Sequence, residues 1–151
     1  MPVVEENVRI AQPPEVVFAY LSQPENVSAW DSSIVAAEQI GSGPITTGTR
    51  WRGASKIMGR RFDWVTEVTD LSAPFEMTSR SVEGKLTFTV RYGLQNDGAG
   101  GTNLTYRVEA ESGLGGVFGR FGDPLVERAQ SRTVRGNLAR LAEALSAPSM
   151  A

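Results

Sequence analysis

The hydrophobic residues near the end of the chain recur with the spacing of one face of an α-helix. Between residues 123 and 145 their separations are one, three or four positions, and they are Val126, Ala129, Thr133, Val134, Leu138, Leu141, Ala142 and Leu145. Asp123 is suited to the N-cap and Pro124 to the first helical position. The pattern predicts one helix about 34 Å long, whose apolar face needs a sheet to pack against.

Apolar and polar residues alternate over most of residues 33–110, which predicts β-strands with one buried face. The alternation is clearest over 61–70 and 85–94, and weaker strands are expected over 3–10, 33–40, 49–55, 75–81 and 102–110. The inward positions include Trp51, Phe62, Trp64, Thr66, Val68, Phe75, Met77, Ser79, Leu86, Phe88, Val90, Tyr92, Leu94, Leu104, Tyr106, Val108 and Ala110. In the strand over 3–10, the same alternation places Glu6 inward beside Val4 and Val8.

Two short helices are expected between the first two strands. Gln12-Pro13-Pro14-Glu15 stops a strand and starts a helix, for which Val16, Val17, Tyr20 and Leu21 supply the buried side. A second helical turn is expected from Pro24 to the Trp30-Asp31 pair. Consecutive strands with short turns usually pair with their neighbours, and only the last helix is long enough to cover the apolar face. The sequence therefore predicts an α+β fold over residues 1–151 as one domain.

The composition excludes several kinds of chemistry. Cysteine and histidine are both absent, so disulfides, thiolate or imidazole metal sites and Ser-His or Cys-His relays cannot form. No metal or cofactor is expected. A net charge of −2 argues against general nucleic-acid binding. With no signal peptide and no apolar run long enough to span a bilayer, we expect a cytoplasmic monomer or homodimer without stable membrane insertion.

The order of elements resembles the helix-grip fold of the START-like and birch-pollen-allergen superfamily, and the local sequence is most similar to its polyketide cyclase/dehydrase branch. The residues that carry the resemblance are 11–21, 24–31, Gly48-Thr49, the strand 62–66 and the long closing helix. The resemblance implies a curved antiparallel sheet of about seven strands wrapped around the C-terminal helix, with a ligand cavity between the two.

The inward aromatic residues fit the walls of such a cavity, although the same residue types also describe a filled core. The expected ligand-binding residues are Trp51, Phe62, Trp64, Thr66, Phe75, Met77, Ser79, Phe88, Tyr92, Tyr106, Phe118, Phe121, Val134 and Leu138. Phe118 and Phe121 belong to a glycine-rich stretch that lacks the spacing of a phosphate-binding loop. Trp30 and Asp31 are expected to have structural roles, with a position at the cavity mouth as the alternative for Asp31.

Three functions remain open on the sequence alone. The first is binding or carriage of a small hydrophobic molecule, such as a lipid, a polyketide or an aromatic compound. The second is a polyketide-type cyclase or dehydratase, with Tyr92 or Tyr106 as the acid or oxyanion donor. The third is a protein-interaction domain that uses the cationic hairpin of Arg50, Arg52, Lys56, Arg60 and Arg61.

Overall fold

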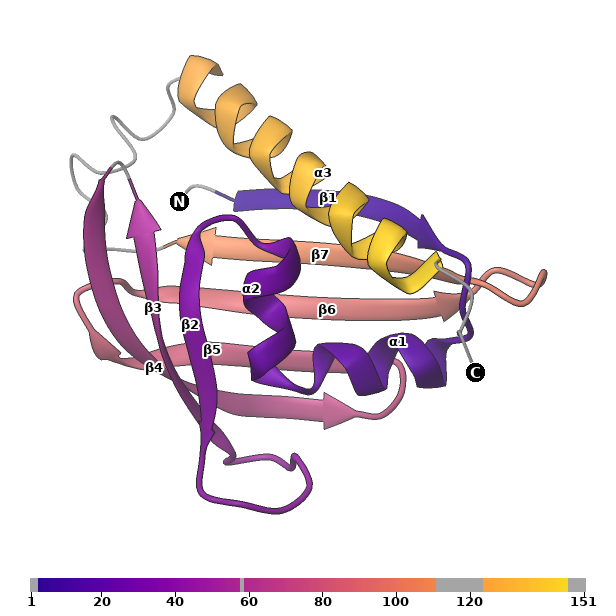
Figure 1. The fold of residues 1–151 in the computed structure, drawn as a ribbon, viewed down its shortest axis with the longest axis horizontal. Helices are drawn as coiled ribbons and strands as arrows, with labels where there is room; N and C mark the ends of the chain where they lie inside the picture. The colour runs from indigo at the N-terminus through magenta and orange to yellow at the C-terminus, as the bar shows by residue number, and fades with distance from the viewer. Residues whose placement is uncertain (1–2, 58, 111–123, 147–151) are drawn as a thin grey trace.

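A computed structural model describes residues 3–57, 59–110 and 124–146 of the chain (Figure 1). Its helices and strands follow in the order β1 (Val3–Ile10), α1 (Pro14–Leu21), η1 (Pro24–Asn26), α2 (Val27–Trp30), β2 (Ile34–Ile40), β3 (Arg50–Ile57), β4 (Arg60–Ser72), β5 (Glu76–Gly84), β6 (Phe88–Asn96), β7 (Thr102–Ala110) and α3 (Pro124–Ser146). The predicted strands and helices are therefore confirmed, and the helical turn predicted from Pro24 onward consists of the 3₁₀ turn η1 followed by α2. The proposed N-cap, Asp123, lies outside the described residues.

The strands form one seven-stranded antiparallel sheet in the order β1-β7-β6-β5-β4-β3-β2. Neighbours in this order are also neighbours along the chain, except that β1 pairs with the last strand, β7. The sheet curves around the helices, with α1 and α2 over its middle strands and α3 running diagonally across the β1 side (Figure 1). This is the architecture expected from the sequence.

The alternation of apolar and polar residues predicts the concave face of the sheet well. On β4 the four predicted inward residues are all buried, and they are Phe62, Trp64, Thr66 and Val68. Leu104 and Tyr106 on β7 are buried in the same way. Burying aromatic and aliphatic side chains on one face supplies the main stabilising free energy of such a sheet.

Helix α3 packs chiefly against β1. Leu138 and Leu141 of its apolar face are fully buried and belong to the main hydrophobic core. Glu6, predicted to point inward from β1, is half-buried and lies 3.9 Å from Arg135 of α3. An inward carboxylate at the end of the sheet is therefore paired with a cation of the helix that covers it. Among the described residues, no helix combines the length and apolarity needed to cross a bilayer.

Val16 and Phe75 do not lie inward as predicted, and Thr133, predicted on the apolar face of α3, is exposed. Val16 is 43% exposed, and the buried side of α1 is formed instead by Pro14, Val17, Phe18 and Leu21, which are spaced by one, three or four residues. Phe75 is 52% exposed. It precedes the first residue of β5, and its backbone N–H donates to the carbonyl of Ser72 at 2.7 Å, which closes a turn. The predicted strand therefore begins one residue too early.

The cationic hairpin is largely neutralised by acids on neighbouring strands. Arg50 pairs with Glu67 and Arg52 with Glu38, at 3.1 and 2.7 Å. Arg61 lies 3.1 Å from Asp63, and the guanidinium of Arg60 lies over the ring of Phe62. Glu38 and Glu67 lie outside the hairpin sequence, so the pairing depends on the antiparallel register of the sheet.

Gly53 of β3 creates the room that Trp64 of β4 occupies. The two residues are direct cross-strand partners. A Cβ at Gly53 would lie 2.6 and 2.7 Å from Cη2 and Cζ2 of the indole, and would also strike the carbonyl oxygen of Ala36. The indole therefore lies across the backbone of β3 only because residue 53 has no side chain.

We predict that Gly53→Ala lowers the free energy of unfolding by about 1–3 kcal/mol, the usual effect of overpacking, and shifts the tryptophan fluorescence maximum. Gly93→Ala is the matched control, because a Cβ at Gly93 meets only Thr105, at 4.0 Å. Denaturant unfolding of both variants measures the difference. Equal stabilities for Gly53→Ala and Gly93→Ala would contradict the proposed close approach.

Candidate functional site

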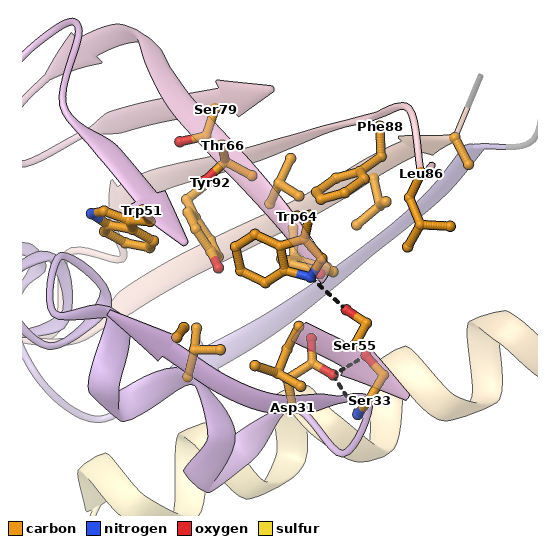
Figure 2. Close-up of a pocket in the computed structure, with 17 residues that line it drawn as sticks. Asp31, Ser33, Trp51, Ser55, Trp64, Thr66, Ser79, Leu86, Phe88 and Tyr92 are labelled. Atoms are coloured by element: carbon orange, nitrogen blue, oxygen red, sulfur yellow. Dashed lines mark hydrogen bonds between the residues drawn. The ribbon is translucent and has the colours of Figure 1, made fainter. Parts of the chain in front are cut away.

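A cavity of about 170 Å³ lies on the concave face of the sheet, beneath α2 and β2 (Figure 2). Its walls are mostly aromatic and aliphatic, with a few hydroxyl groups and one carboxyl group among the described residues. The lining residues are Val27, Asp31, Ser33, Ile34, Ala37, Trp51, Ser55, Trp64, Thr66, Ser79, Leu86, Phe88, Val90, Tyr92, Tyr106, Val108 and Ala110. Large apolar walls with a few polar groups are typical of a small-molecule site.

The structure brings seven of the residues proposed from sequence to this cavity, namely Trp51, Trp64, Thr66, Ser79, Phe88, Tyr92 and Tyr106. Three others are buried elsewhere: Phe62 packs with Trp64 and Leu86 in a second cluster, while Met77 and Leu138 lie in the main core. Val134 packs against that core, and Phe75 is on the surface. Phe118 and Phe121 lie outside the described residues.

The cover of the cavity is formed, among the described side chains, by α2, the turn at residues 31–33 and β2. The side chains of α3 that the structure describes, over residues 131–146, do not line it. Leu138 and Leu141 of α3 join Ile10 and Leu104 in the main core instead. The helix therefore fills the space near β1 and leaves the hollow toward the middle of the sheet.

Four hydroxyl groups in the cavity are available to a ligand. Those of Thr66, Ser79, Tyr92 and Tyr106 make no hydrogen bond to any other described residue, and none of the four oxygens is fully buried. The indole N–H of Trp64, in contrast, donates to Oγ of Ser55 at 2.9 Å. The cavity thus combines fixed aromatic walls with free hydroxyls that can orient a polar atom of a ligand.

Tyr92 and Tyr106 form an aromatic group with Trp30. The tyrosines are cross-strand partners with ring centroids 5.5 Å apart, and Trp30 contacts both edge-on at 6.4 and 5.9 Å. Burial, and secondly the charge of Asp31, raises the pKa of both phenols well above the ordinary value. Both hydroxyls therefore stay protonated near neutral pH and can donate hydrogen bonds, but neither can serve as a base.

Asp31 follows α2 and is only 8% exposed. Its Oδ1 accepts hydrogen bonds from the backbone N–H and hydroxyl of Ser33, at 2.9 and 2.8 Å, and from Nδ2 of Asn137 at 3.2 Å. Burial raises the pKa of this carboxyl, while the bonds from Ser33 and the charge of Arg140 partly oppose the rise. Asp31 thus joins the cavity cover to α3 and also places an ionisable group in the cavity wall.

Asp31 combines the structural role expected from the sequence with a place in the cavity wall. The structural role is correct, because Asp31 accepts a hydrogen bond from Asn137 of α3, which lies 106 residues away. No local pattern indicates this long-range contact. Among the described residues there is no group of three or more acidic side chains that could hold a metal ion.

We predict that Asp31 makes the protein less stable as pH rises. Its pKa in the folded state lies above the ordinary value of 3.8, so the folded chain binds the proton more tightly than the unfolded chain does. The contribution of Asp31 to the free energy of unfolding is then greatest below about pH 4. It falls as pH rises through the folded-state pKa of Asp31. Asp31→Asn removes this titration, so the variant gains stability relative to wild type as pH rises from about 4 through the folded-state pKa of Asp31.

Denaturant unfolding across this range tests the prediction, with Asp63→Asn as a control because the Asp63 side chain is 77% exposed. Parallel stability curves for wild type and Asp31→Asn would contradict it.

Solved structures with this fold come from several sources. The chain superimposes on protein TTHA0849 of Thermus thermophilus with a TM-score of 0.76 and 22% identity, covering 98% of this chain and 99% of that one. A START superfamily protein of Mycobacterium smegmatis gives 0.74 and 15%, covering 95% and 96%. The di-domain ARO/CYC protein BexL of the BE-7585A biosynthetic pathway gives 0.66 and 14%, covering 95% of this chain and 46% of that one.

At these identities the superpositions show a shared fold only. No curated protein has a significant match to the sequence. The family model described as "Polyketide cyclase / dehydrase and lipid transport", however, matches residues 1–146, almost the whole chain. The chain therefore belongs to the polyketide cyclase/dehydrase and lipid-transport family.

Proposed function

We propose that this protein binds a small, mainly apolar molecule in the cavity between the sheet and the α2–β2 segment. The observation that carries the proposal is a largely aromatic hollow in which four hydroxyl groups have no partner among the described residues. Burying ligand carbon against these walls contributes roughly 25 cal/mol per Å². The hydroxyls of Thr66, Ser79, Tyr92 and Tyr106 would set the orientation of the ligand.

The size of the cavity favours a compact ligand. Its volume of about 170 Å³ is close to that of an engineered cavity of roughly 150 Å³ that holds one benzene. Pockets for drug-sized ligands are larger, about 300–1,000 Å³. A molecule of one or two rings fits these dimensions better than a long acyl chain does.

The family and its structural relatives support binding of a hydrophobic molecule as the general activity. The family description includes lipid transport, and one relative is a START superfamily protein. The third function considered from the sequence, interaction through the cationic hairpin, has less support. Arg50, Arg52 and Arg61 each pair with a carboxylate, so three of the five cations of the hairpin are already neutralised.

We predict that tetralin, a two-ring hydrocarbon, quenches the tryptophan fluorescence of the protein in a saturable manner. Ser79→Leu should weaken this binding at least tenfold, because Ser79 lines the cavity and the larger side chain occupies ligand space. Thr78→Leu is the control, since Thr78 is the next residue on β5 and is absent from the cavity lining. Equal affinities for the two variants, or no saturable binding to wild type, would contradict the proposal.

A second function, cyclisation of a polyketide-like chain, is favoured by the phenols of Tyr92 and Tyr106. Because both stay protonated, either can donate a hydrogen bond to a carbonyl or enolate oxygen. The family description names cyclases, and BexL is an ARO/CYC protein. Holding a flexible chain in a reactive conformation would supply much of the acceleration.

For this function, we predict faster cyclodehydration of 2,4,6-heptanetrione to 2,6-dimethyl-4-pyrone in the presence of the protein. Tyr92→Phe should reduce the acceleration by about 100-fold or more, the usual effect of losing one oxyanion donor, while tetralin affinity stays within threefold. Absorbance of the pyrone follows the reaction. A rate equal to that in buffer, or one unaffected by Tyr92→Phe, would rule out this role for Tyr92.

A further inference from the structure

The two oxygens of Asp31 have unequal surroundings. Oδ1 accepts three hydrogen bonds, two from Ser33 and one from Asn137. Oδ2 accepts none from any described residue, and this oxygen is not fully buried. Figure 2 shows this second oxygen turned away from Ser33, toward the side of the cavity where Trp64 and Tyr92 lie. One oxygen is therefore committed to the protein, and the other faces the ligand space.

No cation contacts Asp31 among the described residues. Arg140 of α3 is the nearest positive charge to influence it, but its guanidinium donates to the carbonyl oxygen of Trp30 at 3.3 Å and to Oδ1 of Asn137. The other titratable groups that face Asp31 are the phenols of Tyr92 and Tyr106, which are neutral. The buried carboxylate thus lacks a direct counter-ion, although three donors on Oδ1 favour its charged form.

The walls around Oδ2 suit a positive charge. Five aromatic side chains line the same cavity, namely Trp51, Trp64, Phe88, Tyr92 and Tyr106. Cations are attracted to the faces of such rings, and aromatic enclosures are a common way to bind organic ammonium groups. A carboxylate oxygen without a partner, set among aromatic rings, combines the two interactions that an ammonium ion needs.

We propose, building on the ligand-binding function above, that the cavity selects a small hydrophobic amine whose ammonium group donates a hydrogen bond to Oδ2 of Asp31. The hydrocarbon part of the amine would pack against the aromatic walls, and the hydroxyl of Tyr92 lies on the same side of the cavity as Oδ2 (Figure 2). The ligand class is thus a one- or two-ring compound bearing an aliphatic amino group.

An amine has an advantage that a neutral ligand lacks. Asp31 loses most of its hydration when the chain folds, because its side chain is already buried without ligand, so the amine does not have to overcome that desolvation again. A neutral hydrocarbon would cover Oδ2 without providing a partner. Its binding would then be accompanied by proton uptake at Asp31, whereas amine binding would not.

The test compares 2-aminotetralin with 2-tetralol, a neutral ligand of the same shape, by calorimetric titration at pH 7.5. Asp31→Asn should weaken binding of the amine by about 10- to 100-fold, the range expected for a hydrogen bond to a charged group. Affinity for the alcohol, which can donate a hydrogen bond to Oδ2 but carries no charge, should fall by a clearly smaller factor than affinity for the amine. Asp63→Asn is the matched control and should leave both affinities unchanged, because Asp63 is exposed on β4 and lines no part of this cavity.

The pH dependence of ligand affinity gives a second readout. It uses wild-type protein, so it remains available if Asp31→Asn does not fold. Wild-type affinity for the amine, which stays charged below about pH 10, should rise with pH as Asp31 ionises, and affinity for the alcohol should not. Ser33→Ala removes the side-chain hydrogen bond to Oδ1, so it should move the midpoint of this rise to higher pH. A midpoint unchanged by Ser33→Ala, or an amine affinity independent of pH, would overturn the proposal.

The outcomes separate the two proposals. If neither the amine nor the alcohol binds wild type, the proposed function fails and this inference fails with it. If the alcohol binds but the amine shows no dependence on Asp31, only the amine proposal is overturned.

Discussion

The hydrogen bonds at Asp31 hold the cover of the cavity in place. This one carboxyl group joins the turn after α2, through Ser33, to the middle of α3, through Asn137. Asn137 also accepts from the backbone N–H of Ser32 at 3.3 Å, and Arg140 donates to the carbonyl of Trp30. The α2–β2 segment is thereby fixed to a helix that is itself anchored on β1, so the segment can cover the sheet without collapsing onto it.

Rigid side chains maintain the hollow from below. Trp64 is held by its hydrogen bond to Ser55 and lies across Gly53, where no side chain competes for the space. Trp30 stands edge-on against Tyr92 and Tyr106 at the base of the cover. Each of these rings is restrained by a contact with a neighbouring strand or helix. The cavity is therefore a consequence of packing large rings beside very small residues.

Much of this arrangement could be predicted from local patterns. Alternation along the strands identified the inward faces, including Trp64, Thr66, Tyr92 and Tyr106, because successive side chains of a strand point to opposite faces. The spacing of apolar residues identified α3, because residues three or four positions apart lie on the same face of an α-helix. The inward assignment of Phe75 is wrong because alternation does not show where a turn ends and a strand begins.

What could not be predicted depends on contacts between distant parts of the chain. The diagonal position of α3 is set by its packing on β1, and this determines that Leu138 fills the core rather than the cavity wall. The neutralisation of Arg52 by Glu38 requires the β2–β3 register. The role of Asp31 depends on Asn137, whose position no spacing near residue 31 could reveal.

The central claim is that a hollow persists between the sheet and the α2–β2 segment while Asp31 holds that segment to α3. A crystal structure determined under xenon pressure tests it most directly, because xenon enters apolar cavities that hold small rings. The account predicts xenon density bounded by Trp51, Trp64 and Tyr92, beneath an intact Asp31–Asn137 hydrogen bond. Collapsed side chains that leave no site for the gas, or a cover detached from α3, would contradict it.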